Sequence, residues 1–422
     1  MKKYITNIPF LLPIIAFIGE RQTCTIHYIS LTVALCITLY FYFLLFRQRR
    51  KAKIIIPYQK LFNIYLLWVC VTFIRSIFYI EYWDDARAMV NGAMLMFLPI
   101  IIWHFTVPSN LNKLLAIWCQ KWILLSITLL LFFFVKEGYA HLLAPAFFLI
   151  FFYEKIPSKY KKYTWLILVI VLYGGFSARS NILRFAMIIV FTWAFISHGY
   201  FNNWIKIGWT FLIFLPIILV SIGIAGIYNP FEALEKDDSF KIELKEAQSV
   251  SGDATQMANA DTRTFLYTEV IKSSIKNDYW LLGHSFARGY ECNSLMGVTA
   301  YLEQHARTGR MERVSCEVGM LNPFTWMGII GFLLYATLII WASWIGVFRG
   351  KNKYVRGIGM FIAFRFLFSF IEEMQTFSWN SITLWLMIAI CISSSFLNMT
   401  NNVFEIWIKN IFHPLKKYNS ST

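Results

Sequence analysis

Long apolar segments recur along almost the whole chain and are separated by short polar turns. A transmembrane α-helix needs about 20 mostly apolar residues, so the pattern predicts an all-α polytopic membrane protein with about twelve transmembrane helices. The predicted spans lie near residues 5–19, 26–46, 61–80, 90–106, 113–135, 139–153, 163–176, 181–197, 207–227, 323–347, 355–371 and 379–397. The pair at 163–176 and 181–197 leaves one alternative open, which is a single long broken helix.

One polar segment, residues 228–322, is far longer than the other connections between spans. It begins with an acidic stretch (EALEKDDSFKIELKEAQ) and continues through a patch of small residues (SVSGDATQMANAD). In the following stretch, TRTFLYTEVIKSSIKNDYWLLG, apolar residues recur at helical spacing: Phe265, Leu266, Val270, Ile271 and Ile275. Loops of this length in compact proteins are usually functional or disordered, and the periodic apolar residues favour a functional segment.

These boundaries divide the chain into four parts. Residues 1–227 are predicted to form an N-terminal transmembrane bundle of about nine helices, and residues 228–322 form the large loop. Residues 323–397 contain the C-terminal transmembrane helices, and residues 398–422 form a tail. With 58% hydrophobic residues, the composition lies outside the range of ordinary soluble domains and agrees with this division.

Basic residues indicate which side of the membrane each connection faces. If the N-terminus is cytoplasmic, the basic segments at 47–53, 154–162 and 349–356 and the tail with Lys416 and Lys417 all face the cytoplasm. Because cytoplasmic loops carry an excess of lysine and arginine, we predict that both termini are cytoplasmic and that the large loop lies outside. The formal net charge of +16 then reflects these loops and not nucleic-acid binding.

Arginines mark the predicted outer side. Arg179 and Arg184 belong to the stretch GGFSARSNILRF, and the large loop adds Arg263 and Arg288. A charge near the hydrocarbon region is costly and therefore indicates function, and guanidinium groups bind phosphate oxygens bidentately. We predict a pocket for a lipid-linked diphosphate. As alternatives, the Arg184 side chain extends to the membrane interface, and the arginines at 307, 310 and 313 form a solvated face.

Three residues are candidate bases for the deprotonation of a hydroxyl group: His284, His305 and Glu317. Each has the alternative of being an ordinary loop residue. Glu317 lies close to the span that begins near residue 323, which places it near the predicted membrane surface.

Two cysteines, Cys292 and Cys316, both fall in the large loop, where an oxidising compartment would allow a disulfide between them. The alternatives are two unpaired thiols or a bond from either one to Cys24. The sequence has no C-x-x-C pair and no histidine–cysteine spacing of a metal site, so we expect no metal and no cofactor.

The chain resembles the O-antigen polymerase and ligase family of bacterial inner membranes. The resemblance rests on the number of spans, the late large loop and three stretches: FSARSNILRF, DTRTFLYTEVIKSSIKNDYWLLGHSF and EVGMLNPFTWMGIIGFLLY. These are similar to the family's serine–arginine turn before a span, its loop helix ending in a Leu-Gly turn, and its exit from the loop into a span. They cover mainly residues 170–345.

The resemblance implies a GT-C-like fold and a reaction. Members of the family transfer a glycan from undecaprenyl diphosphate to an acceptor at the periplasmic face, without a nucleotide sugar or a metal. It further implies that Arg179 and Arg263 bind the diphosphate, and it makes a chain-length regulator a plausible partner. Ligases of the family carry a histidine–asparagine pair where this chain has Glu317 and Val318, which favours a polymerase.

We therefore expect a surface-polysaccharide polymerase that acts on undecaprenyl-diphosphate-linked oligosaccharides among the lipids of the inner membrane. Two other functions stay open. One is an O-antigen ligase that transfers the glycan to lipid A core. The other, from a different class, is a flippase or transporter of lipid-linked oligosaccharides, which needs no large external loop.

Overall fold

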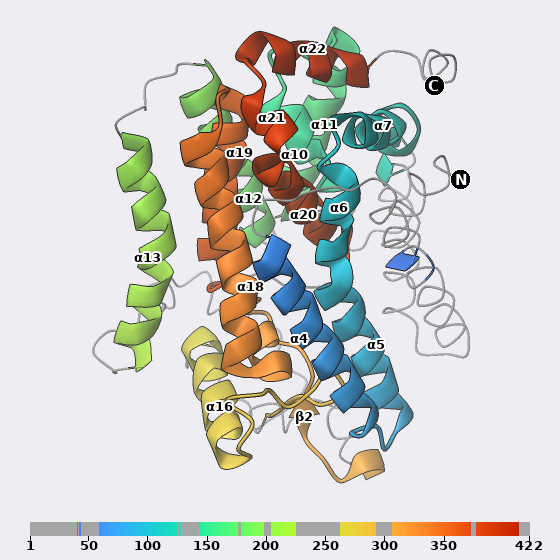
Figure 1. Cartoon of the computed structure of the whole chain (residues 1–422), viewed down its shortest axis with the longest axis vertical. Coiled ribbons are helices and arrows are strands. Elements are labelled where there is room, and N and C mark those ends of the chain that lie inside the picture. Colours follow the sequence, from blue (N-terminus) through green and yellow to red (C-terminus); the bar gives the residue numbers. More distant parts are fainter. Residues whose placement is uncertain are drawn as a thin grey trace.

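The computed structural model of the protein describes residues 40, 42–43, 59–124, 126–127, 143–175, 179–197, 204–224, 262–292, 306–372 and 377–412. These residues form a mostly helical bundle with two short strands (Figure 1). The elements are α4 (Gln59–Ile77), α5 (Trp83–Phe97), η1 (Leu98–Ile101), α6 (Ile102–Phe105), α7 (Pro108–Ile117), η2 (Trp118–Trp122), α10 (Ala146–Phe151), α11 (Ser158–Gly175), α12 (Arg179–Phe191), η3 (Thr192–Ser197), α13 (Trp204–Ile224), α16 (Thr262–Lys276), β1 (Tyr290–Glu291), β2 (Glu312–Arg313), α18 (Leu321–Arg349), α19 (Lys353–Phe368), α20 (Trp379–Ile392), α21 (Ser394–Asn398) and α22 (Asn401–Ile411).

The chain is an all-α membrane protein. Within the described residues, four helices are long and apolar enough to cross a membrane: Gln59–Ile77, Trp83–Phe105, Trp204–Ile222 and Leu321–Arg349. They match the spans predicted at 61–80, 90–106, 207–227 and 323–347. The shorter helices α11, α12, α19 and α20 occupy four further predicted spans. The span at 5–19 and most of the span at 26–46 lie outside the described residues, and the spans at 113–135 and 139–153 are described in part.

Helix α4 has one exposed apolar face and one buried face. Its exposed apolar residues Ile64, Leu67, Val71 and Ile74 follow a helical spacing along one face. The opposite face is buried and contains Phe62, Tyr65, Val69, Thr72 and Ser76. An apolar face is left exposed at no cost when lipid covers it, because hydrocarbon chains are as apolar as the side chains.

The two ends of the bundle differ in their elements (Figure 1). Helix α16 and both strands lie at one end, which we call the α16 end, and α22 lies across the opposite, α22 end. Two of the basic segments meet at the α22 end, because Lys155 contacts Glu405 at 3.0 Å and Lys353 contacts Glu154 at 3.7 Å. Segments 154–162 and 349–356 thus share one end of the bundle, as the sequence predicts. Helix α22, which belongs to the predicted tail, lies at the same end.

Helix α18 is broken at Gly328, which has φ 68° and ψ −171°. The break leaves backbone groups without partners inside the helix, and the segment before β1 supplies them. His284 N donates to Thr325 O at 2.7 Å, and Ile329 N donates to Trp280 O at 2.9 Å. Irregular backbone is tolerated at membrane depth only where protein surrounds it and satisfies its polar groups.

Helix α4 donates hydrogen bonds to three more carbonyls around this break. Trp68 Nε1 donates to Met327 O at 3.0 Å, and the Arg75 guanidinium donates to Leu282 O and Gly283 O, both at 2.8 Å. Ser76 Oγ accepts a hydrogen bond from Phe286 N at 2.8 Å. The segment 279–289 is therefore held between α4 and α18 and forms a fixed platform at the α16 end.

A small second core joins α16 to the strands. Strands β1 and β2 pair antiparallel, with Tyr290 opposite Arg313. The core consists of Leu266, Val270, Tyr290, Cys292, Cys316, Val318 and Leu321. Cys292 and Cys316 are both buried in this core and form no disulfide with each other, whereas Cys24 lies outside the described residues.

Candidate functional site

Two helices that carry predicted phosphate ligands meet at the end of α19. Arg184 of α12 donates from Nη2 to Glu372 O at 3.3 Å, and its guanidinium carbon lies 5.1 Å from the centre of the Phe368 ring. Tyr267 of α16 donates from its hydroxyl to Phe370 O at 2.7 Å. We call residues 368–372 the α19 turn. Helices α12 and α16 thus both contact the α19 turn, from parts of the sequence that lie far apart.

The two main predicted ligands lie at the starts of these helices. Arg179 is the first residue of α12, and Arg263 is the second residue of α16. Position 263 precedes Tyr267 by four residues, which is about one helical turn. The helices that carry Arg179 and Arg263 are therefore anchored to the same turn at the α16 end.

Arg184 is buried, with only 5% of its surface exposed. Its guanidinium contacts a backbone carbonyl and an aromatic ring of the α19 turn, and it does not extend to an exposed interface. The alternative in which this side chain reaches the membrane surface does not fit this geometry. The burial instead gives a permanent positive charge a fixed place beside the α19 turn.

Arg365 is a charged residue that the sequence reasoning missed. It lies in α19 with 1% of its surface exposed and lines a cavity together with Tyr335, Ser369 and Ser381. The signal was visible, because FIAFRFLF (361–368) is an apolar stretch with one arginine inside a predicted span. An ionisable residue in such a place indicates function by default.

Glu317, the first candidate base, lies between β2 and α18. Its Oε1 accepts a hydrogen bond from Arg313 Nη2 at 3.4 Å, and 43% of its side chain is exposed. The neighbouring Cys316 and Val318 pack in the small core against Leu266 of α16. Glu317 therefore lies beside the helix that carries Arg263 and stays accessible to a substrate.

His284, the second candidate base, has a fixed orientation. Its Nδ1 lies 2.6 Å from Gly289 O, so this nitrogen carries the proton and donates it to the carbonyl. The ring stacks on Tyr279 with a centroid distance of 4.6 Å. Nε2 then has the free lone pair, and burial lowers the pKa of His284 despite the bond to Gly289, which raises it. The imidazole is therefore neutral at pH 7.

The position of His284 in the chain separates it from Arg263. It follows the C-terminal end of α16, whereas Arg263 lies at the N-terminal end of this helix of 15 residues. A helix of that length spans about 20 Å. The structure thus groups Glu317 with α16 and places His284 at the other end of that helix, while His305 lies outside the described residues.

The lowered pKa of His284 predicts a loss of stability in acid. In the unfolded chain the imidazole titrates near its ordinary value of 6.5, so below that pH the unfolded state binds a proton that the folded state resists. We expect the melting temperature to fall as the pH drops from about 6.5 towards the lowered pKa, and His284→Gln to reduce this fall. Thermal unfolding of the wild type and of His284→Gln at about pH 7.5 and about pH 5.5 measures the effect. An equal fall in melting temperature in the two proteins would contradict the lowered pKa of His284.

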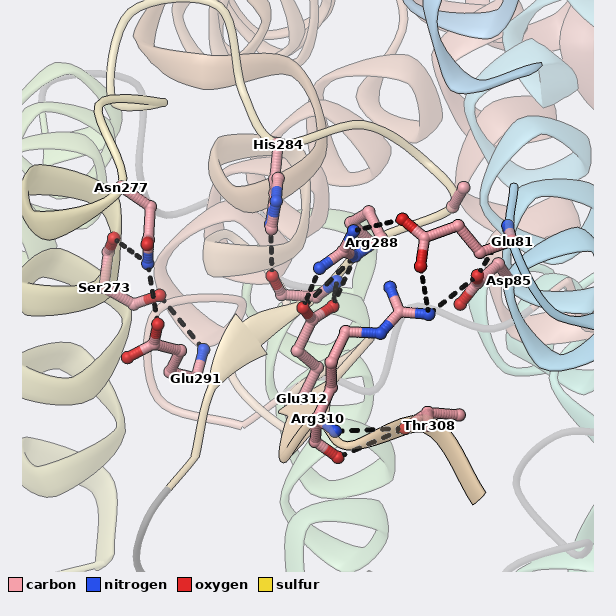
Figure 2. Close-up of polar contacts among 12 residues, drawn as sticks. Glu81, Asp85, Ser273, Asn277, His284, Arg288, Glu291, Thr308, Arg310 and Glu312 are labelled. Atoms are coloured by element: carbon pink, nitrogen blue, oxygen red, sulfur yellow. Dashed lines mark hydrogen bonds and ion pairs between the residues drawn. The ribbon is translucent and has the colours of Figure 1, made fainter. Parts of the chain in front are cut away.

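A cluster of opposite charges fastens Arg288 and the described residues 306–313 to the start of α5 (Figure 2). Arg310 Nη2 lies 3.0 Å from Asp85 Oδ2 and 3.6 Å from Glu81 Oε2. Arg288 forms a bidentate pair with Glu312 and lies 3.9 Å from Glu81. Arg307 pairs with Asp84 at 3.3 Å. We call this group the carboxylate clamp.

The carboxylate clamp changes the interpretation of several arginines. Arg288, predicted to bind diphosphate, is engaged by Glu312, and its pKa is raised by that hydrogen bond. Arg310 has only 17% of its side chain exposed and also lies over the Tyr82 ring at 5.0 Å, so it is no part of a solvated face. These guanidinium groups serve first to hold the loop against α5.

Breaking the carboxylate clamp should loosen the loop. Asp85 Oδ2 also accepts hydrogen bonds from Glu81 N and Tyr82 N, both at 3.0 Å. We expect Arg310→Gln to lower the free energy of unfolding by about 1–3 kcal/mol, because it leaves Asp85 without its charged partner. Chemical denaturation with and without added salt measures the free energy of unfolding. Lys276→Gln is the control, because Lys276 forms an exposed pair with Glu291, and it should change the free energy of unfolding little. Equal effects of the two substitutions would argue against the clamp.

The described residues contain no group of three or more histidine, cysteine, aspartate or glutamate side chains that could hold a metal ion. Comparison with known proteins adds nothing to this geometry: no protein-family model, curated protein or solved structure was found to match the chain.

Proposed function

We propose that the protein is a glycosyltransferase that polymerises a bacterial surface polysaccharide such as O-antigen. The observation that carries the proposal is the anchoring of two helices to the α19 turn. Arg184 of α12 and Tyr267 of α16 both bond to backbone carbonyls of this turn. Arg179 lies five residues before Arg184 and Arg263 lies four residues before Tyr267, and we propose that these two arginines bind the same diphosphate headgroup.

In the proposed reaction, the growing glycan on undecaprenyl diphosphate is the donor and a single lipid-linked repeat unit is the acceptor. A hydroxyl oxygen of the acceptor forms a bond to the anomeric carbon of the donor, and the bond from that carbon to the diphosphate oxygen breaks. The electron pair leaves with the diphosphate, whose charge Arg179 and Arg263 stabilise. The hydroxyl proton goes to Glu317, which lies exposed beside α16.

The proposed orientation places the α16 end outside the inner membrane and the α22 end in the cytoplasm. It is supported by the basic segments 154–162 and 349–356, which lie together at the α22 end. Loops rich in lysine and arginine remain on the cytoplasmic side during insertion. Lipid-linked repeat units would then reach the arginines from the outer leaflet.

Reconstitution tests the proposed function. Purified protein in liposomes is given an undecaprenyl-diphosphate-linked repeat unit, and the products are separated by size. A ladder of longer lipid-linked glycans is the expected result. Transfer to added lipid A core without a ladder would identify a ligase, and movement of intact substrate between leaflets without bond formation would identify a flippase. Either result would contradict the proposal that the protein is a polymerase.

A further inference from the structure

The cavity beside Arg365 lies inside the helical bundle and has no role yet in the proposed reaction. Its lining combines the guanidinium of Arg365 and three hydroxyl-bearing residues with four apolar side chains: Tyr335, Ser369 and Ser381, and Ile339, Phe366, Leu384 and Trp385. Arg365 is 1% exposed and Ser381 is 8% exposed, so the site is built from side chains that are almost completely buried. The bundle thus holds a permanently charged guanidinium group in the wall of this cavity.

The surroundings of the cavity favour an anion. Ser381 is the third residue of α20, a helix of 14 residues, so the peptide N–H groups of the first turn of α20 lie next to the cavity wall. The N-terminus of a helix attracts negative charge, and an arginine adds a full positive charge to that partial one. Both contributions have the same sign and act on the same small space.

The size of the cavity limits what enters it. Its volume of about 10 Å³ has room for one water-sized group. One oxygen atom of a phosphate fits this space, whereas a complete diphosphate does not. A phosphate bound here therefore inserts a single oxygen and keeps its other oxygens outside the cavity.

The position of the cavity connects it with the α19 turn. Arg365 lies three residues before Phe368, the ring over which the Arg184 guanidinium lies. Ser369 lines the cavity and belongs to the α19 turn that Arg184 and Tyr267 contact. Arg184 and the Arg365 cavity therefore both lie near the C-terminal end of α19, within reach of one headgroup bound there.

We propose that the Arg365 cavity binds a phosphate oxygen of a lipid headgroup and forms a second phosphate site apart from Arg179 and Arg263. The use of this site rests on the proposed function: an enzyme that joins two lipid-linked glycans holds two phosphate-bearing headgroups at once. Arg365 and Arg184 bind one of them while Arg179 and Arg263 hold the other.

Binding of undecaprenyl phosphate to the full-length protein in nanodiscs tests the proposal without requiring polymerisation. Two variants are compared with the wild type: Arg365→Gln removes the charge, and Ser381→Val fills the cavity while it keeps the charge. We expect each to raise the dissociation constant about tenfold or more, the value of one charged hydrogen bond. Arg349→Gln, an exposed arginine at the opposite end of α18 that lies over Trp344, is the matched control and should bind as the wild type does.

Inorganic phosphate is added as a competitor. It distinguishes the two possible sources of the bound phosphate, which are a lipid headgroup and free phosphate. Failure to compete supports a lipid headgroup, and full competition supports the same cavity with free phosphate as its ligand. If Arg365→Gln does not fold, the binding affinity of Ser381→Val tests the proposal. Folded variants that bind with wild-type affinity overturn the proposal. If the wild type makes no polymer but the two substitutions still weaken the binding of undecaprenyl phosphate, the proposed function is wrong and the cavity remains a phosphate-binding site.

Discussion

Gly328→Ala is expected to prevent accumulation of the folded protein. Gly328 has φ 68°, a conformation in which a side chain is strained, and a Cβ there would lie 2.5 Å from Gly283 N and overlap the carbonyl of Leu281. Gly283 is its counterpart, with φ 79°, and a Cβ there would overlap the backbone of Trp326 and Met327. Backbone atoms cannot move aside as a flexible side chain does, so the hydrogen bonds around the break in α18 would be lost.

The yield of folded protein in detergent, measured by size-exclusion chromatography with fluorescence detection, checks this result. Gly309→Ala is the matched control, because Gly309 also has positive φ (66°) but no atom within 4 Å of the added Cβ. It isolates the conformational strain, about 1 kcal/mol, from the crowding. If Gly328→Ala and Gly309→Ala accumulate equally, the close packing of Gly283 against Gly328 is not important for the fold.

Arg179→Ala and Arg263→Ala are each expected to lower the rate of polymer formation at least about 100-fold, while the protein still inserts and folds. The reason is that, in the proposed reaction, each substitution removes a permanent positive charge that stabilises the negative charge of the leaving diphosphate. Lysine at either position should restore part of the rate, because it keeps the charge but loses the planar fork of donors.

The rates are measured in the reconstituted system with purified variants at equal density. Arg349→Ala, at the opposite end of α18, controls for the loss of one arginine from the molecule and should retain the wild-type rate. Full polymer formation by a well-folded Arg179→Ala or Arg263→Ala protein would contradict the assignment of these residues to the diphosphate.

Segments whose structure depends on local pattern were predictable from the sequence. The apolar stretches of α4, α13 and α18 are long and uninterrupted enough to reveal membrane helices. The helical spacing of Leu266 and Val270 predicted α16, whose buried face contains both residues. In α19 the charges of Arg356 and Arg365 interrupt the apolar pattern, and here the helix has 16 residues and is shorter than a typical span.

Pairings between distant residues could not be predicted in this way. The sequence shows the charges of Arg288 and Arg310, but their partners depend on the packing of the loop against α5. Asp85, for example, lies 225 residues before Arg310. The stretches around Gly283 and Gly328 were recognised separately as motifs, and only the folded backbone shows that they pack against each other. The Arg365 cavity likewise needs α18, α19 and α20 together.

The break in α18 has a consequence for how the protein is made. Trp68 and Arg75 of α4 donate to carbonyls that lie 259 and 207 residues later in the chain. At a synthesis rate of about 5–20 residues per second, their acceptors leave the ribosome on the order of tens of seconds after α4 does. During that interval a guanidinium and an indole N–H inside a membrane helix need temporary partners. We therefore expect nascent α4 to stay in contact with the insertion machinery during this interval. A crosslinker at position 75 should form adducts with that machinery until residue 328 has been translated.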